Sequence, residues 1–226
     1  MKNLFTLALL AFAMTVQAQD FDVVEATNSG NEAYRNKDYK KAYELYTQVL
    51  ADNEKNGKEL DKNINYNAAY CAAKAKMNDE AIALFRKSIE ADYKVDKSYQ
   101  QLGKIQMDTK DVDGAIETLN AGLGKFPDDA SMKKLIGSCY QKKAMPLYNE
   151  ANSIKKAANE SGMNTSDPDK FKAEYAKADA KFQEALPLFE KAYEYDPTNK
   201  NVVKGLQNIY TTLDMPEKAA SLNVAE

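Results

Sequence analysis

Histidine and tryptophan are both absent from this 226-residue sequence. Without histidine, the chain lacks the commonest general base and the commonest metal ligand of proteins. The sequence also contains no G-x-S-x-G motif and no phosphate-binding glycine loop. We therefore expect a protein that is not an enzyme, binds no metal and needs no cofactor.

Proline and glycine are sparse, with six and nine residues, whereas alanine, lysine, glutamate, leucine and tyrosine are plentiful. This composition favours helices over strands and turns. The formal net charge is −3, which argues against nucleic-acid binding because that function requires a strongly basic surface. No apolar run beyond the first 18 residues is long enough to span a bilayer.

The first 18 residues have the pattern of a cleavable export signal. Lys2 supplies the positive start, residues 4–16 are mostly apolar, and residues 16–18 form a small-residue cleavage site. The apolar run of about 13 residues is shorter than the roughly 20 that a membrane-spanning helix needs. We predict a signal peptide over 1–18 and a mature domain over 19–226 without a membrane segment; the alternative is an uncleaved anchor.

The stretch 97–129 contains one complete helix–turn–helix unit. Gly103 and Ala115 are small residues that allow two helices to approach closely, and Leu102 and Leu119 can fill the seam between them. A unit of this size cannot bury its apolar face alone, so copies of it are expected along the chain.

Copies are present at a nearly constant spacing. The seam alanine recurs at Ala42, Ala81, Ala115, Ala185 and Ala219, and an aromatic residue or leucine follows four residues later in the first four copies. The pattern resembles the tetratricopeptide repeat, whose period is 34 residues. The resemblance implies an all-α solenoid, a right-handed superhelix of repeats over 23–56, 62–95, 96–129, 130–199 and 200–226, the last being a C-terminal cap. About five extra residues near Asn56–Lys58 lengthen the first inter-repeat loop.

The fourth repeat contains a long insertion. Ala115 and Ala185 are 70 residues apart, which is one period plus 36. Apolar and small residues step by three and four on both sides of it, in the series Gly137, Tyr140, Ala144, Leu147, Ala151, Ile154, Ala158 and the series Phe171, Tyr175, Ala178, Phe182, Ala185, Phe189. Ser161–Gly162 stops the first helix, and Asp167–Pro168 starts the second. We predict an antiparallel coiled-coil hairpin over about 144–180, with a disordered loop as the alternative.

The only two cysteines, Cys71 and Cys139, fall on the first helices of different predicted repeats. One complete repeat separates them, which places their Cα atoms too far apart for a disulfide. We expect two buried, unpaired thiols that act as small apolar side chains. Export would permit a disulfide, which is the alternative.

In this repeat family the first helices line a concave groove that holds peptides. Mapped onto this sequence, the resemblance selects Asn31, Tyr34, Arg35, Asn63, Tyr66, Tyr70, Lys74, Lys97, Lys104, Lys134, Lys142 and Lys204, together with Gln100, Met107, Asp108, Ser138, Gln141, Asn201 and Asn208. The charged members sum to about +6 in a mildly acidic chain. This contrast favours an acidic or C-terminal-carboxylate peptide. The alternative interpretation is that lysines are simply common on helical surfaces.

A more specific peptide site was compared with the same residues. Asn31, Asn67 and Lys97 match three positions of the carboxylate clamp found in some eukaryotic co-chaperones. Thr27 and Gln101 stand where that clamp needs basic residues, and the first repeat interval is five residues too long. The clamp is therefore not predicted.

Taken together, these patterns predict a non-catalytic scaffold or adaptor for protein–protein interaction. The leader and the long insertion resemble exported tetratricopeptide proteins of the Bacteroidota, which implies the periplasm, cell surface or secreted fraction of a Gram-negative bacterium. One alternative is a structural subunit of an envelope assembly or secretion complex that contacts its partners through the hairpin. Another is an unrecognised enzyme or a glycan binder that stacks tyrosine rings on sugars.

Overall fold

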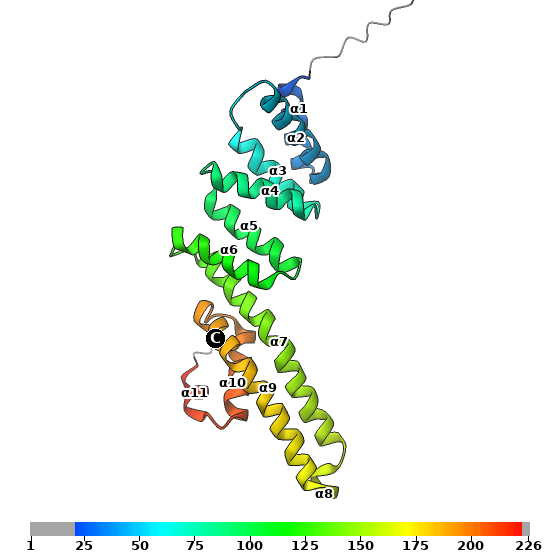
Figure 1. Cartoon of the computed structure of the whole chain (residues 1–226), viewed down its shortest axis with the longest axis vertical. Coiled ribbons are helices and arrows are strands. Elements are labelled where there is room, and N and C mark those ends of the chain that lie inside the picture. Colours follow the sequence, from blue (N-terminus) through cyan, green and yellow to red (C-terminus); the bar gives the residue numbers. More distant parts are fainter. Residues whose placement is uncertain (1–20, 223–226) are drawn as a thin grey trace, which may run out of the picture.

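The computed structural model describes residues 21–222, so the predicted signal peptide and the last four residues of the predicted cap lie outside it. Over this range the chain folds into helices, with no strand. They are α1 Val23–Arg35, α2 Tyr39–Lys55, α3 Lys62–Lys74, α4 Asn78–Glu90, α5 Val95–Asp108, α6 Val112–Lys125, α7 Ala130–Glu160, α8 Met163–Ser166, α9 Pro168–Tyr195, α10 Lys200–Thr212 and α11 Pro216–Ser221. Figure 1 shows them stacked in pairs along the long axis of the molecule.

Polar side chains at the loop ends start most of the first helices. Asp22, Asp61, Asp129 and Asn199 accept hydrogen bonds from backbone amides in the first turn of α1, α3, α7 and α10. Each such cap satisfies amides that lack a partner within the helix and contributes about 1 kcal/mol. The start of α5 differs, because Lys94 has a left-handed backbone with φ 46° and provides no side-chain cap.

The turn inside each short helix pair has the same backbone conformation. Lys37, Lys76, Lys110 and Asp214 occupy equivalent positions and all have positive φ angles, between 56° and 69°. Glycine adopts this left-handed region most readily, because a Cβ atom crowds the following carbonyl oxygen. The sequence thus places strained residues at four equivalent turns.

Small residues bring the paired helices together as the sequence indicates. Ala42, Ala81, Ala115 and Ala185 are fully buried, and so are Tyr46, Phe85, Leu119 and Phe189, one turn further along the same helices. A Cβ atom at Gly103 would lie 2.6 Å from Cγ of Leu119. The axes of α5 and α6 are therefore closer than two side chains could allow.

The core is divided into clusters that follow one another along the stack. One cluster joins α1 and α2 to α3, the next joins α3 and α4 to α5, and a third lies among α5, α6 and α7. The fourth joins α7 and α9 to α10 and Leu222. Each helix pair thus buries its apolar face against the next pair, as in other one-dimensional repeat stacks.

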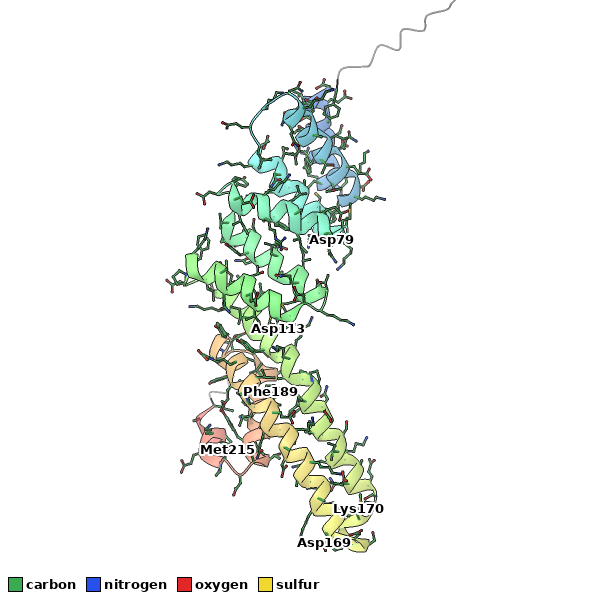
Figure 2. The ribbon with its side chains drawn as sticks, in the orientation of Figure 1. Asp79, Asp113, Asp169, Lys170, Phe189 and Met215 are labelled. Carbon is green, nitrogen blue, oxygen red and sulfur yellow. The ribbon has the colours of Figure 1, made fainter. Side chains whose placement is uncertain are left out.

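The fourth pair consists of two long antiparallel helices, α7 and α9, joined by the short helix α8. They extend beyond the stack, and α8 lies at the far end (Figure 1). Alanines of α7 face aromatic residues of α9 in a buried seam, where Tyr148 contacts Phe182 and Phe189 at centroid distances of 5.6 and 5.5 Å. In Figure 2, Asp169 and Lys170 mark the tip of this hairpin, while Phe189 lies where the hairpin meets the stack.

Candidate peptide-binding face

The predicted groove residues all lie on α1, α3, α5, α7 and α10, which are the first helices of their pairs. None of the twelve principal residues is buried; Asn31, Tyr66 and Tyr70 are half-buried, and the other nine are exposed. We call these twelve residues, together with the seven others that the same mapping selects, the first-helix face. The twelve principal residues are therefore exposed enough for a ligand to reach them.

A cluster of three tyrosines lies at the N-terminal end of this face. The rings of Tyr34, Tyr39 and Tyr70 have centroid separations of 6.0 to 6.3 Å. Lys74 Nζ lies 5.2 Å from the centre of the Tyr70 ring, within the range of a cation–π interaction. Tyr34 is 38% exposed, and burial raises the pKa of its hydroxyl above the usual value. The cluster therefore offers aromatic surface, and Tyr34 adds a neutral hydroxyl group.

A second aromatic cluster surrounds Tyr66. Its ring contacts Phe85 and Tyr93 edge-on, at centroid distances of 5.7 and 6.2 Å. Lys94 Nζ lies 4.4 Å from the centre of the same ring. The Tyr93 hydroxyl donates a hydrogen bond to Asn63 Oδ1 at 3.2 Å.

Three residues of these clusters, Tyr39, Tyr93 and Lys94, were missed by the sequence analysis. Tyr39 begins α2, and Tyr93 and Lys94 belong to the loop between α4 and α5. The family mapping considers only first helices and so passes over them. A sequence signal did exist, because Tyr93 and Lys94 lie at the end of the second predicted repeat, next to the first helix of the third.

Several predicted groove residues are engaged in contacts that hold the repeats together. Gln100 is only 6% exposed, and its Nε2 donates to Asp129 Oδ2 at 2.8 Å, so its prediction as a free groove residue is wrong. Lys142 Nζ donates to the Met107 carbonyl oxygen at 3.0 Å, which places a cation at the C-terminal end of α5, where the helix dipole favours it. These contacts link α5 to the N-terminus and body of α7.

Two further hydrogen bonds occupy polar members of the same face. The Tyr46 hydroxyl donates to Asn31 Oδ1 at 2.8 Å, which ties α1 to α2. Asn199 Nδ2 donates to Gln141 Oε1 at 3.1 Å, which ties the start of α10 to α7. The amide groups of this face therefore serve packing first, and only their remaining donors and acceptors are available to a ligand.

The positive charge of the face is smaller than the sequence count implies. Lys97 Nζ lies 3.4 Å from Asp96 Oδ2, a side chain that the sequence mapping omitted. Over residues 21–222, by contrast, Lys104, Lys134 and Lys204 make no ion pair. They lie on three successive first helices. Arg35 and Lys74, nearer the N-terminus of the face, make no ion pair in this range either.

The chemically reactive groups are buried elsewhere. Cys71 and Cys139 are both fully buried and unpaired, as predicted. Burial raises the pKa of the Cys71 thiol to about 12 and that of Cys139 to about 11, so neither forms the thiolate that a nucleophile requires. Among the residues that the structure describes, no group of three or more acidic or cysteine side chains could hold a metal ion. No helix of residues 21–222 is both long and apolar enough to cross a membrane.

A stack of helix pairs with an aromatic and cationic face on the first helices defines an α-helical repeat protein suited to binding other proteins. Two family models, both described as tetratricopeptide repeat, match residues 27–93 and 72–139. Together they span half of the sequence. The chain belongs to the tetratricopeptide repeat family, whose members are protein-interaction scaffolds, and the predicted all-α solenoid is confirmed.

The chain is also similar to individual proteins. It is 29% identical over 117 residues to Hsp70-Hsp90 organizing protein 1 of Glycine max, a match that covers 52% of this chain and 20% of that protein. The chain thus spans about a fifth of the length of this curated relative. A crystal structure of MamA protein is 12% identical, with a TM-score of 0.54 and coverage of 88% of this chain and 87% of the other. MamA from Desulfovibrio magneticus RS-1 is 17% identical, with a TM-score of 0.51 and coverage of 88% and 89%. These two structures support the fold alone.

Proposed function

We propose that this protein is a non-catalytic adaptor that binds an acidic peptide of a partner protein on its first-helix face. The observation that carries the proposal is the row of Lys104, Lys134 and Lys204, which lie on α5, α7 and α10 and make no ion pair within residues 21–222. A carboxylate facing each ammonium group would gain a charge-assisted hydrogen bond. The aromatic clusters around Tyr70 and Tyr66 would receive the apolar side chains of the same peptide.

The expected affinity is modest, about −8 kcal/mol or a micromolar dissociation constant. The lysines are exposed, so each ion pair with a ligand is partly screened by salt. Binding should therefore weaken as the ionic strength rises. The name of the Glycine max relative refers to Hsp70 and Hsp90, which supports a role in joining other proteins and does not identify the partners of this chain.

The proposed setting is the envelope of a Gram-negative bacterium, either the periplasm or the cell surface. The support is the leader-like pattern of residues 1–18, with its positive start, short apolar run and small-residue cleavage site. An N-terminal sequence of the protein purified from its native source would test this part separately. A mature N-terminus at Gln19 is expected, whereas an intact Met1 would contradict export by cleavage.

Affinity capture from native envelope extract tests the binding face. The mature chain is compared with the Lys104→Glu/Lys134→Glu variant, which reverses two charges on adjacent first helices. The matched control is Lys40→Glu/Lys125→Glu, which reverses two exposed charges on α2 and α6, outside the face. We expect the first variant to lose the partner and the control to retain it. Equal retention by both variants would rule out the first-helix face as the binding site.

A second candidate function is supported by the shape of the fourth repeat. The distal part of the α7–α9 hairpin projects away from the stack (Figure 1), so it could anchor the chain in a larger assembly as a structural subunit. Lys155 pairs with Asp179 and Asn159 with Tyr175 across the hairpin. These contacts show which positions of α7 and α9 lie opposite each other, and so where the two helices can be shortened together. Replacing 156–178 by a short turn removes the tip without cutting the buried cluster of Ala151 and Phe182. Loss of the partner on this truncation alone would favour this second function.

A further inference from the structure

A pocket of about 280 Å³ lies between the first and second repeats, away from the first-helix face. We call it the loop pocket, because the lengthened loop between α2 and α3 forms one of its walls. Its lining comprises Leu50, Asn53, Glu54, Lys58, Glu59, Leu60, Asp61, Asn65 and Lys87. Most of these residues come from the end of α2 and the loop, so the pocket is independent of the face described above.

Asn65 lines the loop pocket and is fully buried, with 0% exposure. Its Nδ2 donates to the Leu84 carbonyl oxygen at 2.9 Å and to Ser88 Oγ at 2.8 Å. Its Oδ1 has no hydrogen-bond partner. A buried acceptor without a donor is unfavourable and rare in folded proteins. This oxygen therefore indicates a donor that the described chain itself does not supply.

The next repeat has an aromatic residue at this position. Tyr99 lies 34 residues after Asn65, and Gly122 lies 34 residues after Ser88. Tyr99 packs directly against Gly122, since a Cβ atom at that glycine would lie 2.9 Å from Tyr99 Cβ. The aromatic–glycine pair of the third repeat is thus replaced by a smaller amide–hydroxyl pair in the second.

The cleft between the second and third repeats is equivalent to the loop pocket, but no loop residues form a wall of it. It is lined only by helical residues, namely Arg86, Ile89, Glu90, Tyr99, Leu102, Glu117, Thr118 and Ala121. In the second repeat, by contrast, residues 58–61 of the extended loop line the pocket. Two differences from the third repeat therefore coincide at one place: an amide where the third repeat has an aromatic ring, and an added wall.

We propose that the loop pocket receives one aromatic side chain with a polar hydrogen, a tryptophan or a tyrosine, from a partner protein. The indole N–H or phenol O–H donates to Asn65 Oδ1, which the ring reaches by displacing the exposed Leu60 side chain, because this oxygen has almost no accessible surface in the unliganded chain. The ring lies between Leu50 and Leu60, of which Leu60 is 39% exposed. Aromatic residues of this kind, seated in a pocket of the partner, dominate many protein interfaces.

The charges around the pocket disfavour a carboxylate ligand. The lining has a formal charge of −1, because it contains three acidic residues (Glu54, Glu59 and Asp61) and two basic ones (Lys58 and Lys87). A neutral aromatic ring with a single donor avoids the resulting repulsion. An acidic peptide segment would instead bind the first-helix face, so the two contacts select different parts of a partner.

The test compares indole with 1-methylindole, which keeps the ring but lacks the N–H donor. Each is titrated into the ¹⁵N-labelled chain without residues 1–18, and backbone amide shifts are recorded. We expect indole to shift the amides of 53–65 and the Asn65 side-chain amide, and to bind at least fivefold more tightly than 1-methylindole. Because the chain has no tryptophan, the fluorescence of N-acetyl-tryptophanamide, excited selectively over tyrosine, provides an independent titration.

Variants locate the contact. Asn65→Tyr restores the ring found at Tyr99 and should abolish indole binding, whereas Asn65→Leu removes the acceptor and should abolish the preference for indole over 1-methylindole. Lys62→Tyr adds the same ring to an exposed position of α3 outside the pocket and should leave binding unchanged.

Three results would overturn the proposal: no shifts in 53–65 at millimolar indole, equal affinity for the two probes, or tighter binding of benzylamine than of indole. The last would assign the pocket to an amine held by the rim carboxylates. None of these results affects the lysine variants of the first-helix face, so the two proposals fail independently.

Discussion

Substitution of Gly103 by alanine tests the close approach of α5 and α6 on which each repeat depends. A Cβ atom at this position would lie 2.6, 2.7 and 2.9 Å from Cγ, Cδ2 and Cδ1 of Leu119. Leu119 is 0% exposed, and it is packed in the cluster of α5, α6 and α7. Neither the added methyl group at position 103 nor the Leu119 side chain can move away without a shift of α5 or α6.

The expected magnitude follows from two opposing terms. Overpacking of a well-filled core costs about 1–3 kcal/mol, whereas replacing glycine by alanine inside a helix gains about 0.5–1 kcal/mol. The net loss of unfolding free energy should be roughly 1–2 kcal/mol. Gly124→Ala is the matched control, because a Cβ atom there would meet nothing within 4 Å, so it should stabilise by about 0.5 kcal/mol.

The assay is thermal and urea unfolding followed by far-ultraviolet circular dichroism. For a domain of this size, 1 kcal/mol shifts Tm by about 2–4 °C, so Gly103→Ala should lower Tm by roughly 2–8 °C. In a Leu119→Ala background the same glycine substitution should no longer destabilise, since the clashing atoms are gone. The reasoning is refuted if Gly103→Ala raises Tm as Gly124→Ala does, because the helices would then not be in contact at this seam.

Two further predictions concern stability. Lys76→Gly and Lys110→Gly should each raise the unfolding free energy by about 0.5 kcal/mol in urea titrations. Glycine relieves the left-handed strain at φ 63° and 69°, although it also adds entropy to the unfolded chain. Lys40→Gly, inside α2, should instead lower the unfolding free energy by about 1 kcal/mol, and a loss at all three positions would contradict the assignment of strain. Burial raises the pKa of the Cys71 and Cys139 thiols to about 12 and 11, so the neutral thiols favour the folded state fully below pH 9, and this stability is lost as the pH rises above the pKa of the unfolded thiol. Between pH 9 and 11 the unfolding free energy should fall by up to about 1.4 kcal/mol per pH unit for each thiol; the Cys71→Ala/Cys139→Ala variant should show a shallower fall, and identical slopes would contradict the buried-thiol account.

The sequence by itself was sufficient for the repeat architecture. The seam residues, such as Ala81 and Phe85 in one copy and Ala115 and Leu119 in the next, recur because each helix pair packs only against its neighbours. A short-range periodic pattern therefore contains most of the information about this kind of core. The long helices of the fourth repeat follow from the same logic, since a seam with steps of three and four residues keeps one face of each helix apolar.

Only the tertiary structure decided which polar residues remain available to a partner. Gln100 and Lys142 share a helix face with Lys104 and Lys134 in the sequence pattern, yet the first two are held by Asp129 and the Met107 carbonyl. Such contacts join residues about a whole repeat apart, so they depend on how successive pairs are rotated and how long side chains are placed. Helical periodicity assigns a residue to a face, but it does not specify the partner across the interface. For the same reason the sequence did not predict the loop pocket, because the unpaired Asn65 Oδ1 becomes apparent only when α2, α3 and α4 are packed together.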